Sequence, residues 1–237
     1  MKQIFTQRAG MIGMICLLAV SLTSCLKNDD NHQYIAPKVA LVSAINASPD
    51  AQPVDFFLDQ NRANNFYIKS GESLDYINAY TGKRTITFYV GASNQKIISD
   101  TATFKANKLY SVFLANVVST PNILVIPDSV GVPDEGKAGV RFVNLSPDNQ
   151  ALDLVVKAGA TLASAKSYKQ YSPFVTVNGG NTYTFEIHKA GTAMVLYTLT
   201  DVQIKNKTLN TIWVQGLSAA TDSKKLTAHA QENVYYY

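Results

Sequence analysis

Residues 45–55 read INASPDAQPVD, and residues 143–153 read VNLSPDNQALD. Six of these eleven positions are identical at an offset of 98 residues: Asn46/Asn144, Ser48/Ser146, Pro49/Pro147, Asp50/Asp148, Gln52/Gln150 and Asp55/Asp153. A match that recurs at a fixed offset indicates duplication of one structural unit. We therefore expect two copies of a domain of about 90 residues, a size that one hydrophobic core can support.

Further matches follow the motif in the same order. Residues 85–88 (TITF) match residues 182–185 (TYTF), and residues 109–114 (LYSVFL) match residues 209–214 (LNTIWV). Aromatic residues recur at matched positions, which predicts that they lie in the cores: Phe88/Phe185, Phe113/Trp213 and Tyr76/Tyr171. By strand alternation, Tyr89 is expected on the face opposite Phe88, with Glu186 as its counterpart.

The local pattern of each copy is typical of β-strands. Segments such as TITFYV, NILVI and TYTFEI are short, rich in β-branched and aromatic residues, and bounded by Gly, Asn, Pro or Asp. No segment keeps a helical period, so the fold class is predicted as all-β, with two tandem antiparallel β-sandwich (immunoglobulin-like) domains. The expected organisation is a lipoprotein signal peptide (1–24), a lipidated Cys and flexible tether (25–37), a first sandwich (38–130), a linker (131–137) and a second sandwich (138–237).

The N-terminus has the pattern of a secretory signal. Lys2 and Arg8 precede an apolar run from about residue 11 to residue 22, which is too short to span a membrane. The run ends in Leu22-Thr23-Ser24-Cys25, which resembles the bacterial lipobox, and this resemblance implies that Cys25 is lipidated with palmitate-type chains. The alternative is an ordinary signal peptide with a chance cysteine.

The residues after Cys25 bear on localisation. Leu26 is not the Asp that retains some Gram-negative lipoproteins in the inner membrane, so we expect an outer-membrane lipoprotein. Lys27 with Asp29 and Asp30 resembles an export signal and predicts that the protein faces the cell exterior; an inward-facing lipoprotein is the alternative. The predicted membrane partner is reached through the lipid on Cys25, since several acyl chains anchor a protein almost irreversibly.

Composition excludes several classes of protein. The chain has 21 basic and 17 acidic residues, and loss of Lys2 and Arg8 with the signal peptide would leave 19 basic residues and a net charge of +2. Such a balance gives no support for a nucleic-acid partner. The second cysteine, Cys16, would leave with the signal peptide, so no disulfide or four-cysteine zinc site is expected.

The stretch KAGVRFVNLSPDNQALDLVV (137–156) and its upstream copy VALVSAINASPDAQPVDFFL (39–58) resemble the opening strand and turn of the domain of unknown function 4397 family. That resemblance implies tandem β-rich domains that are secreted or lipid-anchored, and it implies no biochemical activity. The second copy departs from the first where Ala151 replaces Pro53.

The repeated motif is predicted to be a structural turn. Proline presets the backbone of a turn, and Asn, Ser and Asp side chains bond to nearby backbone groups. The residues concerned are Asn46, Ser48, Pro49, Asp50 and Asp55 in the first copy, and Asn144, Ser146, Pro147, Asp148 and Asp153 in the second. The alternative is a Ca²⁺ site built from Asn46, Asp50 and Asp55 or from their counterparts, but each motif offers only two acids. We expect no metal and no cofactor.

No catalytic fingerprint is present, and the histidines lie apart, at residues 32, 188 and 229. The chain is therefore predicted to be non-enzymatic, with a role in binding, adhesion or structure. Tyr67, Tyr80 and Tyr168 are expected in loops or at edges, where they could contact a glycan or a surface protein. The alternatives are a carbohydrate-binding accessory lipoprotein of a glycan-uptake system, which needs a row of exposed aromatics, and a hydrolase, which needs converging acids where the copies meet.

Overall fold

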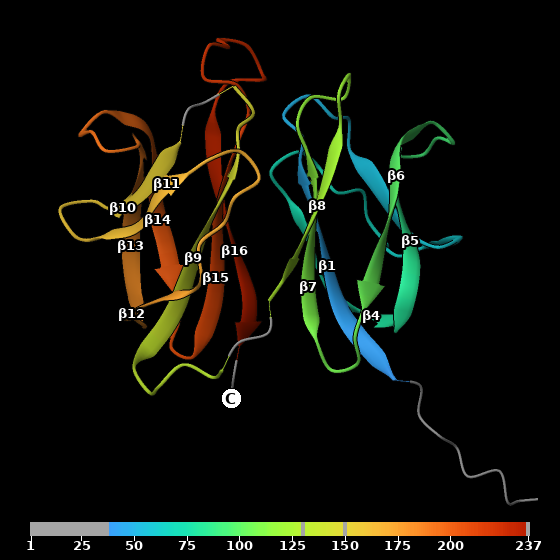
Figure 1. Cartoon of the computed structure of the whole chain (residues 1–237), viewed down its shortest axis with the longest axis horizontal. Coiled ribbons are helices and arrows are strands. Elements are labelled where there is room, and N and C mark those ends of the chain that lie inside the picture. The colour runs from blue at the N-terminus through green and yellow to red at the C-terminus, as the bar shows by residue number, and fades with distance from the viewer. Residues whose placement is uncertain (1–37, 129–130, 149–150, 236–237) are drawn as a thin grey trace, which may run out of the picture. The chain divides into compact units, whose positions relative to one another are not determined.

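A computed structural model describes residues 38–128, 131–148 and 151–235. These residues form sixteen strands in four four-stranded sheets, with no helix among them. Figure 1 shows the sheets paired into two sandwiches, one from each half of the chain. The predicted all-β class with two sandwiches is confirmed. Cys25, the tether and His32 lie outside the described residues, within which no helix is long and apolar enough to cross a membrane.

The first sandwich contains eight strands. One sheet has the order β4-β1-β7-β8 and the other has the order β3-β2-β5-β6. The strands are β1 (Val39–Ala47), β2 (Val54–Leu58), β3 (Asn61–Arg62), β4 (Ser73–Tyr80), β5 (Gly82–Val90), β6 (Lys96–Phe104), β7 (Leu109–Ala115) and β8 (Asn122–Pro127).

The second sandwich repeats this order strand for strand. Its sheets have the orders β12-β9-β15-β16 and β11-β10-β13-β14. The strands are β9 (Lys137–Leu145), β10 (Leu152–Val156), β11 (Thr161–Lys166), β12 (Val175–Asn178), β13 (Asn181–Lys189), β14 (Val195–Ile204), β15 (Thr208–Gln215) and β16 (Thr227–Tyr235). Residues with the same place in the two sets of strand pairings are called counterparts below.

One strand pair in each sandwich is parallel, which the expected antiparallel arrangement did not include. β1 pairs with β7 and β9 pairs with β15 in the parallel sense, whereas the other strand pairs are antiparallel. The parallel register places Phe113 beside Ile45 and Trp213 beside Val143, so Phe113 and Trp213 are counterparts as the sequence predicted. Strand β1 enters one sheet, and the motif then carries the chain across to β2 in the other sheet.

Each sandwich has its own apolar core. Phe56, Phe88 and Phe104 are fully buried in the first, and Phe142 and Phe185 are fully buried in the second. Hydrophobic side chains alternate along these strands because successive residues of a strand face opposite sides of the sheet.

The register corrects one of the sequence matches. Phe88 lies beside Phe56, and Ile187 takes the equivalent place beside Leu154, so Ile187 and not Phe185 is the counterpart of Phe88. The predicted match is wrong by two residues. Both phenylalanines are nevertheless in a core, since a shift of two residues leaves a side chain on the same face of the strand. By the same register, Tyr89 corresponds to His188 and not to Glu186.

A third apolar cluster joins the two sandwiches. It consists of Ile45, Ala47, Phe113, Ala115 and Ile126 from the first, and Val143, Leu145 and Trp213 from the second. The rings of Phe113 and Trp213 meet edge to face with centroids 6.3 Å apart. The matched aromatics Phe113 and Trp213 are therefore buried as predicted, but they form the joint between the copies.

The third predicted aromatic match is wrong. Tyr171 is exposed, and its counterpart is Ser73. Phe174, just before β12, is the counterpart of Tyr76 in β4, since Val175 lies opposite Val140 as Ile77 lies opposite Val42. The sequence spacing failed because the two tyrosines occupy different positions along the same edge of the sandwich.

Candidate functional site

The asparagine of each motif folds its loop back on the sandwich. The Asn46 Nδ2 donates to the carbonyl of Ile68 (3.0 Å), and its Oδ1 accepts the backbone N–H of Ser48 (3.2 Å). Asn144 repeats both bonds with the carbonyl of Lys166 (2.8 Å) and the N–H of Ser146 (2.9 Å). Pro49 and Pro147 stand in the turns that follow. Both asparagines are fully buried, so these hydrogen bonds satisfy groups that water cannot reach.

The first aspartate of each motif ties it to the loop after β7 or β15. Asp50 accepts the N–H of Val118 (2.8 Å), and Asp148 accepts the N–H of Ser218 (2.9 Å) and of Ala219 (3.4 Å). Burial alone would raise the pKa of Asp148, but the backbone N–H groups of Ser218 and Ala219 outweigh it and lower that pKa below its usual value.

The second aspartate of each motif lies on β2 or β10, the strand that follows the motif in the other sheet. Asp55 accepts Arg62 Nε (2.6 Å) and Asn64 Nδ2 (2.9 Å), whereas Asp153 accepts the N–H groups of Ala165 (2.6 Å) and Gly191 (3.0 Å). The two aspartates of one motif thus bind separate sets of donors. Within the described ranges no group of three His, Cys, Asp or Glu side chains could hold a metal ion.

In each sandwich the sheet that does not take part in the joint, β3-β2-β5-β6 or β11-β10-β13-β14, is called the outer sheet. Aromatic and polar side chains surround a hollow of about 400 Å³ on the outer sheet of the first sandwich. Phe57 and Tyr89 lie edge to face with centroids 5.0 Å apart, and the Arg62 guanidinium lies 5.1 Å from the centre of the Tyr67 ring. Phe57, Arg62, Tyr67, Asp55 and the 92–94 loop line this hollow, which we call the aromatic hollow. Tyr67 is 43% exposed, so its ring is available to a ligand.

A second hollow of about 290 Å³ adjoins Arg62. Its polar lining includes Asp59, Asn61, Asn78, Tyr80 and Arg84, over a floor that includes Leu58 and Ile77. Tyr80 is 64% exposed, and Arg84 is ion-paired with Asp59 at 3.1 Å. We call this the edge hollow. It places Tyr80, like Tyr67, at the surface, as the sequence predicted.

The second sandwich has different residues at these places. The counterparts of Phe57, Tyr89 and Arg62 are Val155, His188 and Thr161. Tyr67 is replaced by Ala165, since Lys166 accepts from Asn144 as Ile68 accepts from Asn46. The fold therefore does not require these aromatic side chains, and the hollow is a property of the first copy.

Tyr168 has a different environment from Tyr67 and Tyr80. It is half-buried, burial raises the pKa of its hydroxyl, and Lys169 Nζ lies 5.7 Å from its ring centre. Its hydroxyl finds no hydrogen-bond partner within the described residues.

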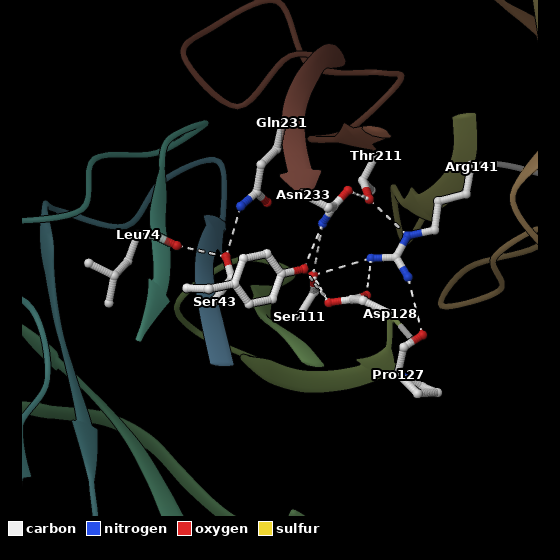
Figure 2. A network of polar contacts seen from close by, with 10 residues as sticks. Ser43, Leu74, Ser111, Pro127, Asp128, Arg141, Thr211, Gln231 and Asn233 are labelled. Carbon is white, nitrogen blue, oxygen red and sulfur yellow. Dashed lines mark hydrogen bonds and ion pairs between the residues drawn. The ribbon is translucent and has the colours of Figure 1, made fainter. Parts of the chain in front are cut away.

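A buried polar network crosses the joint between the sandwiches, as Figure 2 shows. At its centre Arg141 Nη2 lies 2.5 Å from the Asp128 carboxylate, with both side chains at most 1% exposed. Asp128 also accepts from Tyr76 (2.5 Å) and Ser111 (2.8 Å), and Arg141 Nε donates to Thr211 Oγ1 (2.8 Å). Burial raises the pKa of Tyr76 above its usual value, and the Asp128 charge adds to that rise.

Asn233 and Gln231 extend the network along β16. Asn233 accepts from Thr211 and donates to Tyr76, and Gln231 Nε2 donates to Ser43 Oγ (2.8 Å). Ser43 in turn donates to the Leu74 carbonyl (2.7 Å) (Figure 2).

Counterparts meet at this joint. The strand pairings make Ser43 the counterpart of Arg141, Ser111 of Thr211, Ile126 of Gln231 and Tyr76 of Phe174. Asn233 takes the place of Asp128, because Glu232 lies opposite Asn210 as Pro127 lies opposite Tyr110, and Asn233 follows Glu232 where the register shifts. Phe174 lies under the Arg141 guanidinium, 4.8 Å from it. The same face of each sandwich is therefore buried against the other. On that face the negative charge of Asp128 comes from the first sandwich and the positive charge of Arg141 from the second, and each has a neutral residue at the equivalent place in the other sandwich.

The chemistry at the joint bears on the hydrolase alternative. That alternative needs two converging acids there, whereas the acid of the described network is Asp128, which is buried and ion-paired. His229 stacks on Trp213 with ring centroids 5.3 Å apart, and burial lowers its pKa below the usual 6.5. His188 pairs with Glu186 on the outer sheet (2.9 Å).

Sequence reasoning missed Phe57, Arg62, Asp128 and Arg141. Asp128 stood beside the predicted linker, where a charged residue is expected to face water, and it is fully buried. The available signal was the difference between copies: Arg141 and Ser43 occupy equivalent places in otherwise similar apolar strands.

One similar solved structure is the carbohydrate-binding module CBMbc (family CBM26) from Eubacterium rectale Amy13K in complex with maltoheptaose. The sequence identity is 8% and the TM-score is 0.28, and the match covers 78% of this chain and 100% of that chain. A streptococcal virulence factor studied for alpha-glucan binding matches at 11% identity with a TM-score of 0.26, and the match covers 80% of this chain and 96% of that chain. A candidate cell adhesion protein from Bacteroides eggerthii matches at 10% identity with a TM-score of 0.26, and the match covers 85% of this chain and 97% of that chain. These TM-scores are too low to carry any statement about a ligand.

Among curated proteins, no significant match to the chain was found. The family comparison agrees with the motif. Residues 40–155, which run from β1 to β10 and include both copies of the Asn-x-Ser-Pro-Asp turn, match the family described as "Domain of unknown function (DUF4397)", and this match supports the resemblance of the chain to that family.

Proposed function

We propose that the protein is a non-enzymatic binding protein, lipid-anchored at Cys25 in the outer membrane and facing the cell exterior, which contacts a glycan through the aromatic hollow. The observation that carries the proposal is the hollow itself. Phe57 and Tyr89 on the outer sheet and Tyr67 in the loop after β3 are grouped with Arg62 and Asp55. Aromatic faces suit the apolar faces of sugar rings, and a few convergent polar groups suit their hydroxyls.

The aromatic hollow lies at the end of the first sandwich opposite the start of β1. Strand β1 begins at Val39, at the end of the sandwich opposite the motif and the 92–94 loop (Figure 1). The aromatic hollow includes that loop.

We also propose that the second sandwich is a further copy of the same domain. The family match covers the first sandwich and ends at β10. The order of all eight strands and the motif hydrogen bonds recur beyond it. In this arrangement the second copy supports the first through the joint, since it has other residues where the first copy has those of the aromatic hollow.

A glycan array with the detergent-solubilised full chain tests binding. We expect a positive group of glycans, and loss of that signal in Phe57→Ala and Tyr67→Ala. Tyr171→Ala is the matched control, because Tyr171 is an equally exposed tyrosine on the second sandwich. A uniformly negative array, or equal loss in the control, would overturn glycan binding at this site.

The anchor has its own test. Cys25→Ala should abolish palmitate labelling and release the protein from membranes, and protease treatment of intact cells should remove the wild-type protein. Unchanged labelling of the variant would refute lipidation, and full protection from protease would place the protein on the inner face of the membrane.

A further inference from the structure

The two hollows of the first sandwich lie along one strand. Asp55 at one end of β2 lines the aromatic hollow, Asp59 just beyond the other end lines the edge hollow, and Arg62 lines both. Asp59 lies four positions after Asp55, a span of roughly 13 Å at about 3.3 Å per residue of extended strand. One ring cannot occupy both hollows, whereas a linear chain of several rings can follow this edge.

The charges at this edge cancel. Its two guanidiniums and two carboxylates are paired, Arg62 with Asp55 at 2.6 Å and Arg84 with Asp59 at 3.1 Å. The backbone N–H of Thr85 and the Arg84 guanidinium lower the pKa of Asp59, so its carboxylate is ionised at neutral pH. An acidic ligand would have to compete with carboxylates already in place.

The remaining lining suits neutral hydroxyl groups. Asn61 and Asn78 line the edge hollow and Asn94 lines the aromatic hollow, and each amide offers both donors and acceptors. Among the described residues, Arg62 donates only through Nε, so its terminal amino groups are available at the point where the hollows adjoin. Leu58 and Ile77 supply an apolar floor.

The second sandwich again serves as an internal comparison. Tyr80 and Arg84 correspond to Asn178 and Tyr183. The paired charges and the exposed ring of the edge hollow are therefore features of the first copy and not of the fold.

We propose that the ligand is a neutral, linear glycan of several sugar units that lies along β2 and β3, with one part on the aromatic hollow, another part against Tyr80 in the edge hollow, and Arg62 between them. This inference rests on the proposed function and adds the charge and the length of the ligand.

Calorimetry with the detergent-solubilised full chain tests it. The probes are cellohexaose, laminarihexaose, maltohexaose and mannohexaose, the dimers of the same series, and two acidic hexamers, oligogalacturonate and hyaluronan. We expect at least one neutral hexamer to bind at least tenfold more tightly than its dimer and than either acidic hexamer. The affinity for that hexamer should change less than twofold between 50 and 300 mM salt, because little charge is neutralised on binding.

Two variants separate the hollows. Tyr80→Asn, which installs the residue of the second copy, should weaken binding of the hexamer at least fivefold and leave the affinity for the dimer unchanged. Tyr67→Ala should weaken binding of both. Tyr171→Ala should change neither. Preference for an acidic hexamer, a dimer as tight as its hexamer, or an unaffected Tyr80→Asn would overturn this inference and leave glycan binding standing. Failure of every probe to bind would overturn both.

Discussion

Arg141 of the second sandwich and Asp128 of the first form an ion pair at 2.5 Å in a joint that excludes water. Their counterparts are Ser43 and Asn233, which are neutral. A single positive charge from one copy is therefore matched by a single negative charge from the other. Ser111, Tyr76 and Thr211 satisfy further hydrogen bonds of the pair, as a buried pair requires.

Removing the arginine should weaken the joint strongly. In Arg141→Met the Asp128 carboxylate stays buried without a counter-charge, and we expect a loss of about 3–5 kcal/mol in the free energy of unfolding. Urea denaturation followed by fluorescence measures it. Trp213 is the sole tryptophan of the chain and lies in the joint, so it reports directly on separation of the two sandwiches.

The double variant Asp128→Asn/Arg141→Met controls for lost packing. It removes both charges and should recover most of the stability, because no buried charge is then left unpaired. A single variant within about 1 kcal/mol of wild type, or a double variant no better than the single, would contradict this role of the pair.

Gln231 is expected to tolerate replacement by its counterpart. Its buried Oε1 has no hydrogen-bond partner among the described residues, while Ser43 keeps its bond to the Leu74 carbonyl without Gln231. Gln231→Ile, which installs the residue that the first copy has at Ile126, should therefore be neutral or stabilising by about 1 kcal/mol, since an unsatisfied buried acceptor is removed. A shift of the urea midpoint tests this, and a clear loss of stability would show that the Gln231–Ser43 bond outweighs that acceptor.

His229 should make stability fall on mild acidification. Burial lowers its folded-state pKa below the usual 6.5, so between these two values the unfolded chain binds more protons than the folded chain. The contribution of neutral, buried His229 to the free energy of unfolding is complete above about pH 6.5, and it is lost as the pH falls toward the folded-state pKa.

Trp213 fluorescence measures this titration, because the His229 ring is stacked on the indole. We expect a transition with a midpoint below pH 6.5 in wild type and none in His229→Leu, which installs the residue of the first copy, Leu124. An identical transition in the variant would assign it to another group.

Asp148 should hold its neighbouring loop more firmly than Asp50 does. Asp148 accepts backbone N–H groups from Ser218 and Ala219, whereas Asp50 accepts one from Val118. In Asp148→Asn we expect faster amide hydrogen exchange at residues 218 and 219 with the joint unaffected, and in Asp50→Asn a smaller effect confined to residue 118. Exchange followed by mass spectrometry gives both, and equal effects would contradict the difference.

The repeated motif made the fold predictable. Asn46 and Asn144 accept the backbone N–H groups of Ser48 and Ser146 within the motif itself, so eleven residues were enough to predict the turn in each half of the chain. Recurrence of aromatics at matched positions predicted that Phe88 and Phe185 lie in the cores, and both do, although the match between them was wrong by two positions. Local chemistry and alternation survive an error of register.

The joint and the hollows could not be predicted in the same way. Arg141 lies within an apolar stretch, and its partner Asp128 sits thirteen residues away at the end of another strand, so only the folded sheets bring them together. The same holds for Phe57, Arg62 and Tyr67, which meet through the β2–β3 pairing and the loop that follows it. Tyr67 and Tyr80 were predicted at the surface, but the side chains grouped around them were not.

The two halves of this chain have ceased to be interchangeable. If the second sandwich were replaced by another copy of the first, a serine would stand at the place of Arg141 and a second aspartate at the place of Asn233, so two carboxylates would be buried in the joint without a counter-charge. Substitutions in one half are therefore constrained by the other. Through this one ion pair, two sandwiches of the same strand order depend on each other.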